Sequence, residues 1–74
     1  MPNTKIIHGF KVMFEENARE GVQYLEADLD LNEAKVFFDQ AKLKGSAQFE
    51  DDEERQFTLM HQRNDHNYVL IRRT

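Results

Sequence analysis

The 74 residues suffice for one small domain, and a domain of this size buries only about 60% of the surface that its unfolded chain exposes. The chain contains no cysteine, which excludes disulfide bonds and thiolate metal sites and favours a cytosolic protein. Ten basic and fourteen acidic residues give a net charge of −4, which argues against attraction of the whole surface to nucleic acid or anionic lipid. No apolar run approaches the roughly 18 residues that span a bilayer, so we expect no membrane partner.

The charge is unevenly distributed along the chain. Residues 1–54 carry six basic and thirteen acidic side chains, whereas residues 55–74 carry four arginines and the single acid Asp65. An anionic partner would therefore meet the C-terminal end. The acidic part is also compatible with imitation of a nucleic acid toward a DNA-binding protein, although solvated charge explains the same composition.

Two strands are predicted in the N-terminal third. Residues 6–14 alternate with a period of two, which predicts one strand with its even-numbered residues in the core and Met13 on the outer face. The polar cluster 16–21 is typical of a hairpin connection, and residues 22–29 are predicted as the second strand. The phase of that strand stays open, because Val22 and Tyr24 begin on one face and Leu25 continues on the other, as a β-bulge would produce.

A helix is predicted after Asp30. The side chain of Asp30 and that of Glu33 are spaced as in a capping box, and Gly45 can take the left-handed conformation that ends a helix. One apolar stripe recurs at steps of three and four residues, and its members are Leu31, Ala34, Phe37, Phe38 and Ala41. The stripe indicates a helix that packs on a flat apolar surface.

Three strands follow the helix. Ala47 and Phe49 lie in the first, and in the second Phe57 and Leu59 point toward the core while Thr58 and Met60 point away from it. Residues 63–67 are turn formers, and residues 68–74 form the last strand. We expect Val69 and Ile71 of this strand to face the helix and Tyr68, Leu70 and Arg72 to face outward.

The predicted fold is α+β. A single domain over residues 1–74 holds an antiparallel sheet of about five strands in the order ββαβββ, with one helix packed on one face. The order of the strands within the sheet is not determined by the pattern. The opposite face of the sheet is left uncovered.

Candidate metal ligands gather near the C-terminus. His61, Asp65 and His66 are of the ligand types that bind zinc, with His8 as the one further histidine. Their spacing across a loop fixes no coordination geometry, and turns are rich in Asp for backbone reasons, so we predict no metal site and no cofactor. For His8 a position at the sheet rim, satisfied by a neighbouring carbonyl group, is favoured over a role as a buried acid or base.

The sequence contains no catalytic motif. There is no nucleophile elbow, no glycine-rich phosphate loop and no H-E-x-x-H, and the acids 51–54 form a contiguous run of the kind that keeps proteins soluble. We therefore expect a protein that is not an enzyme.

The uncovered sheet face is the predicted binding surface. It is expected to present Met13, Met60, Tyr68, Leu70 and Arg72, a mixture of adaptable methionines with residues enriched at interface centres. This predicts a small cytoplasmic interaction or regulatory domain that binds a protein partner or a second copy of itself, as a homodimer, through that face or an edge strand.

The alternative is weak binding of single-stranded nucleic acid. It would stack bases on Tyr68 and neutralise phosphates with Arg63, Arg72 and Arg73. One aromatic residue is a small platform for this purpose, and the rest of the chain repels phosphate.

Overall fold

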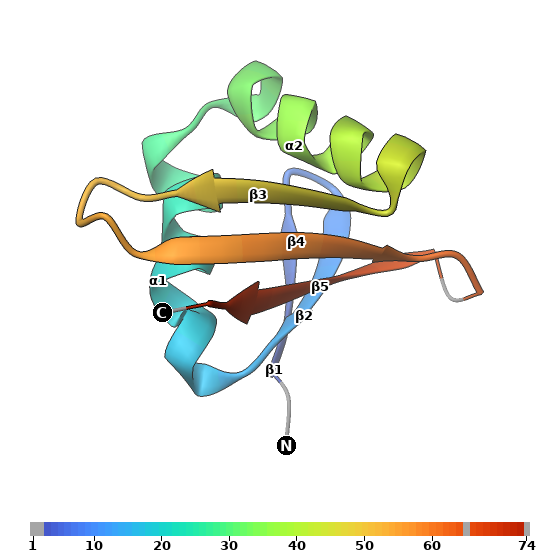
Figure 1. The fold of residues 1–74 in the computed structure, drawn as a ribbon. Coiled ribbons are helices and arrows are strands. Elements are labelled where there is room, and N and C mark those ends of the chain that lie inside the picture. Colours follow the sequence, from blue (N-terminus) through green and yellow to red (C-terminus); the bar gives the residue numbers. More distant parts are fainter. Residues whose placement is uncertain (1–2, 65, 74) are drawn as a thin grey trace.

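The structure is a computed structural model that describes residues 3–64 and 66–73. These residues form an α+β domain with one five-stranded sheet and two helical segments (Figure 1). No helix among them is long and apolar enough to cross a membrane.

The N-terminal alternation belongs to a hairpin rather than to one strand. Strands β1 (Asn3–Ile7) and β2 (Phe10–Phe14) pair antiparallel around a two-residue turn, in which His8 and Gly9 have φ angles of 51° and 88°. Tight hairpins of this kind need positive φ at both turn residues, and glycine adopts it at no steric cost. The turn changes the phase of the first strand, so Ile7 is fully buried, whereas Ile6, predicted in the core, is 58% exposed.

The predicted second strand is helical, and the prediction for residues 22–29 is wrong. A 3₁₀ turn η1 (Glu16–Ala18), helix α1 (Arg19–Gln23) and a π-helical turn η2 (Tyr24–Asp28) follow one another as the first helical segment. Ala18, Val22 and Leu25 are buried, at the steps of four and three residues that one face of a helix requires. The spacing of Val22 and Leu25, which resembles a strand with a β-bulge, therefore results from the repeat of a helix.

The second helical segment is α2 (Leu31–Lys44), and its bounds match the prediction. Of the predicted apolar stripe, Ala34, Phe38 and Ala41 are buried and Phe37 is partly buried, whereas Leu31, in the first turn, is 50% exposed. Asp30 accepts a hydrogen bond from the backbone amide of Glu33 at 2.8 Å, and the Glu33 side chain accepts one from the amide of Asp30 at 3.1 Å. Gly45 ends the helix with a φ of 96°. The capping box and the glycine stop are therefore confirmed.

Strands β3 (Ser46–Glu50), β4 (Gln56–Gln62) and β5 (Asn67–Arg72) form an antiparallel meander. The order of the strands in the sheet is β1-β2-β5-β4-β3, and β2 and β5 pair in parallel. The sheet is therefore mixed, and the prediction of a purely antiparallel sheet is wrong. The parallel pair exists because the two helical segments carry the chain from the end of β2 across the sheet to its other edge, β3.

Both helical segments pack on the same face of the sheet. In Figure 1 the first helical segment lies behind β3 and β4, and no helix of the described residues crosses in front of these strands. Phe38 of α2 is fully buried, with its ring stacked 4.3 Å from that of Phe10 and edge-on to that of Tyr68 at 4.9 Å. One apolar core thus joins the helices to this face, which we call the covered face, and the opposite side is the open face.

Gly21 lets the first helical segment approach the sheet closely. A Cβ atom at this position would lie 2.8 Å from Cδ1 of Phe57 and 3.0 Å from Cδ2 of Leu70. Real Cβ contacts are longer than this, so any larger residue must push α1 away from β4 and β5.

We predict that Gly21→Val lowers the free energy of unfolding by about 2 to 3 kcal/mol, because the added methyl groups overpack the contact with Phe57. Gln23→Val is the matched control: it introduces the same residue at an exposed position of the same helix, and should cost less than about 1 kcal/mol. Urea denaturation at neutral pH measures both. Equal effects would show that the approach at Gly21 is not tight.

Candidate functional site

In β5 the side chains that point toward the core are those predicted to point outward. Tyr68 is 5% exposed and Leu70 is fully buried on the covered face, whereas Val69 and Ile71 point to the open face. Residues 68–71 are all apolar, so the sequence of this strand does not show which of its side chains point to the core. Pairing of Leu70 with Leu59 of β4 decides it, because Leu59 is also fully buried.

This phase divides the predicted partner-binding residues between the two faces. Met13 and Met60 lie on the open face, since both pair with Val69 in neighbouring strands. Tyr68 and Leu70 belong to the core, and Arg72, in the same phase of β5, is on the covered side. The expectation that these last three face outward is therefore wrong.

The open face is poor in charge. Alternation along the five strands places fourteen residues on it, of which only Lys11 and Glu50 are ionisable. The chain as a whole is 32% charged. The members of the open face are Thr4, Ile6, Lys11, Met13, Ser46, Gln48, Glu50, Gln56, Thr58, Met60, Gln62, Asn67, Val69 and Ile71.

An apolar row crosses the middle of the open face. Met13, Val69 and Met60 stand side by side on β2, β5 and β4, and all three are partly exposed. Ile71 adjoins the row and is 39% exposed, and Ile6 on the edge strand β1 is 58% exposed. Adjacent exposed methionine and branched aliphatic side chains are typical of protein contact surfaces.

The residues of the nucleic-acid alternative do not form one surface. Tyr68 is buried, and burial raises the pKa of its hydroxyl group, with a further contribution from Asp39. Arg63 lies in the turn between β4 and β5, whereas Arg72 and Arg73 lie at the other end of β5. The six residues of this strand separate them, a length of about 20 Å. No base can stack on Tyr68 without displacement of α2.

His61 lies near the end of β4 and His66 in the turn that follows this strand, whereas His8 belongs to a different hairpin. His8 lies in the β1–β2 turn, with Nε2 3.1 Å from the carbonyl oxygen of Leu25, a rim position of the kind that was favoured. The ring of His61 packs 5.1 Å from that of Tyr68. Asp65, one of the candidate ligands, lies outside the described residues. Within residues 3–64 and 66–73 no group of three His, Asp or Glu side chains is arranged to hold a metal ion.

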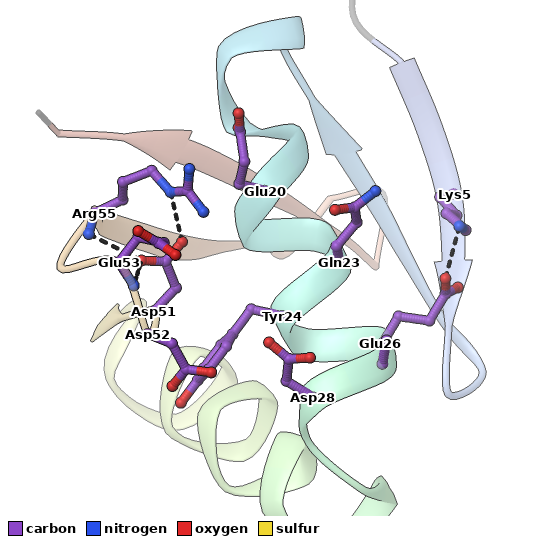
Figure 2. A pocket seen from close by; sticks show the side chains of 11 residues that line it. Lys5, Glu20, Gln23, Tyr24, Glu26, Asp28, Asp51, Asp52, Glu53 and Arg55 are labelled. Atoms are coloured by element: carbon purple, nitrogen blue, oxygen red, sulfur yellow. Dashed lines mark hydrogen bonds and ion pairs between the residues drawn. The ribbon is translucent and has the colours of Figure 1, made fainter.

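A pocket of about 430 Å³ lies between the first helical segment and the loop that joins β3 to β4 (Figure 2). The sequence did not predict it, because its walls come from segments far apart in the chain. We call it the acidic pocket. Its lining consists of Lys5, Glu20, Gln23, Tyr24, Glu26, Ala27, Asp28, Asp51, Asp52, Glu53 and Arg55.

Each of the two cations in the acidic pocket is bound to a carboxylate. Lys5 pairs with Glu26, and Arg55 pairs with Asp51, each at 2.7 Å. The ring of Tyr24 forms part of the wall and stacks on Phe49 at 5.8 Å. Burial raises the pKa of the Tyr24 hydroxyl, and Asp52 and Asp28 add to the effect. The pocket is therefore lined by six acidic side chains against two basic ones, and it has one aromatic wall.

Asp51 organises the loop between β3 and β4. It is 8% exposed, and its carboxylate accepts hydrogen bonds from the backbone amides of Glu53 and Arg55 and from Nε of Arg55. Burial alone would raise the pKa of this carboxyl, but these hydrogen bonds outweigh burial and lower it below the ordinary value of 3.8. Asp51 therefore differs from the rest of the acidic run, which is exposed as a solubilising run would be.

Comparison of the chain with known protein families, curated proteins and solved structures found no match.

We predict that Asp51→Asn lowers the free energy of unfolding at pH 7 by about 1.5 to 3 kcal/mol, because the charged hydrogen bonds to the loop are lost. Since the folded-state pKa is lowered, the contribution of Asp51 is present above the ordinary pKa of 3.8 and is lost as the pH falls through the lowered value. The difference between the variant and the unmodified chain should therefore shrink toward pH 3.

The matched control is Asp52→Asn, which changes the same charge on the next, exposed residue. It should alter the free energy of unfolding by no more than about 0.5 kcal/mol. Urea denaturation from pH 7 down to pH 3 measures both variants, and a difference for Asp51→Asn that is independent of pH would contradict the assigned role.

Proposed function

We propose that this chain is a non-enzymatic, cytoplasmic protein-interaction domain and that its open face is the binding surface. The observation that carries the proposal is the composition of that face: two charged residues among fourteen, around a row of Met13, Val69 and Met60. Interface centres differ from other protein surfaces mainly by this depletion of charge.

The face is favoured over the sheet edges. Lys5 of the edge strand β1 lies on the covered side, where it pairs with Glu26 across the sheet rim. A strand of five residues with an inward-pointing charge is a poor template for a further strand. The other edge strand, β3, is equally short and ends in the exposed acid Glu50.

Charge also distinguishes a protein partner from a nucleic acid. Lys11 and Glu50 cancel, so the open face has no net positive charge to attract phosphates. The acids of the helical segments and of the β3–β4 loop lie away from this face. They keep the chain soluble without opposing a contact there.

The proposal is tested by a photo-crosslinking side chain placed at Ile71 of the open face, in cells that produce the protein. Ile71 is 39% exposed. Val36 on the outer side of α2 is the matched control, because it is also a β-branched aliphatic residue and is 61% exposed. Illumination should yield a protein adduct at position 71 and little or none at position 36.

The adduct yields at positions 71 and 36 show whether binding or solvent exposure determines the reaction. If exposure decided the yield, position 36 would react more than position 71. No adduct at position 71, or equal yields at the two positions, would contradict the proposal.

A further inference from the structure

We infer that the partner of the open face is a second copy of this chain, related by a two-fold axis. The inference rests on the proposed function and names its partner. It is carried by the charge distribution and by the positions of Lys11 and Glu50 in the strand register.

Overall charge restricts how two copies can meet. Each chain has a net charge of −4, so most pairs of surfaces repel each other. Within the described strands the open face is neutral, with one lysine and one glutamate. Two open faces therefore add no repulsion of their own and keep the acidic surfaces of the two copies apart, and methionine and branched aliphatic residues then meet their like.

Lys11 and Glu50 lie at opposite ends of the sheet and toward opposite edges of the open face, because β2 is the second strand from one edge and β3 is the other edge strand; we call these two positions the corners. Lys11 lies on β2 and directly precedes Val12, which pairs with Tyr68 near the start of β5. Glu50 lies on β3 and pairs with Gln56, at the end of the sheet where β5 finishes. Both are exposed, and neither forms an ion pair within the described residues.

The line between these corners has its midpoint between β5 and β4. Around that midpoint lie Val69, Ile71, Met60 and Thr58, in adjacent register positions. Two copies can stack with their open faces toward each other. A two-fold axis that lies midway between the two sheets, passes over this midpoint and is perpendicular to the line from Lys11 to Glu50 then exchanges the two corners. It sets Lys11 of one copy opposite Glu50 of the other, and the same pair forms again at the far corner.

The arrangement has the general form of a protein interface. Apolar side chains from the two sheets fill the centre at the roughly 10 Å spacing of packed sheets, and the two ion pairs lie at the rim. The rim pairs then set the orientation of one copy on the other, because only one two-fold arrangement satisfies both.

Reversal of the two charges tests this geometry. Lys11→Glu sets two pairs of like charges opposite each other in a homodimer, and so does Glu50→Lys. Each single variant should dimerise at least about tenfold more weakly than the unmodified chain. An equimolar mixture of the two variants should recover dimers. In the mixed dimer one corner joins the two introduced side chains, which have opposite charges, and the other corner joins the two original ones, Lys11 and Glu50.

Analytical ultracentrifugation from about 1 to 200 µM, at low and high salt, measures the masses. Lys42→Glu on α2 is the control, since it changes an exposed lysine by the same charge away from the open face. It should leave dimerisation within about threefold of the unmodified chain, which separates a local contact from an effect of net charge.

The outcomes distinguish this inference from the proposed function. Mass restored in the mixture but not in either single variant supports the second copy and its orientation. A chain that stays monomeric at about 200 µM, or dimers that do not respond to the reversed charges, overturns the inference. If such a monomeric chain still forms an adduct with a different protein at position 71, the proposed function stands, and without that adduct both fail.

Discussion

Packing of both helical segments against one face of the sheet is the constraint on which the rest of the structure depends. Ala18, Val22 and Leu25 of the first segment and Phe38 of α2 belong to one buried core together with the strand residues of the covered face. Gly21 makes this possible, because without a side chain α1 can lie directly on Phe57 and Leu70. The described part of the chain includes no further apolar helix that could cover the other face.

The open face follows from that one-sided packing, and its composition gives it a different chemistry from the remainder of the surface. Acidic side chains are concentrated on the helical segments and the β3–β4 loop, where they surround the acidic pocket. Among the acids that line this pocket, Glu26 holds Lys5 at the sheet rim, and Asp51 holds the loop through Arg55. The molecule thus separates a highly charged side from a neutral side with an apolar centre, and depletion of charge of this kind is also found at the centres of protein interfaces.

The candidate site was partly predictable from the residues. Met13 and Met60 were expected on the uncovered face, and they lie there, because in both strands a clear alternation with large buried neighbours sets the phase. The pattern places Tyr68, Leu70 and Arg72 on the wrong face, because a strand with apolar residues at successive positions has no phase of its own. The acidic pocket had no local signal, because β1, the first helical segment and the β3–β4 loop meet only after folding.

Local patterns in the chain were enough to specify the elements whose signals are short-range. The capping box at Asp30, the left-handed stop at Gly45, the stripe of α2 and the alternation of β3 and β4 all depend on residues within a few positions of one another, and all are present. Contacts across the fold settled the rest. The turn at His8 and Gly9 and the helical state of residues 22–28 have local signals, but the alternation continues through the turn, and the change of phase at residues 22–25 is equally compatible with a bulged strand. The parallel pairing of β2 with β5 and the phase of β5 depend on segments far apart in the chain, because β2 and β5 meet only after the helical segments have crossed the sheet and Leu70 takes its face from its pairing with Leu59.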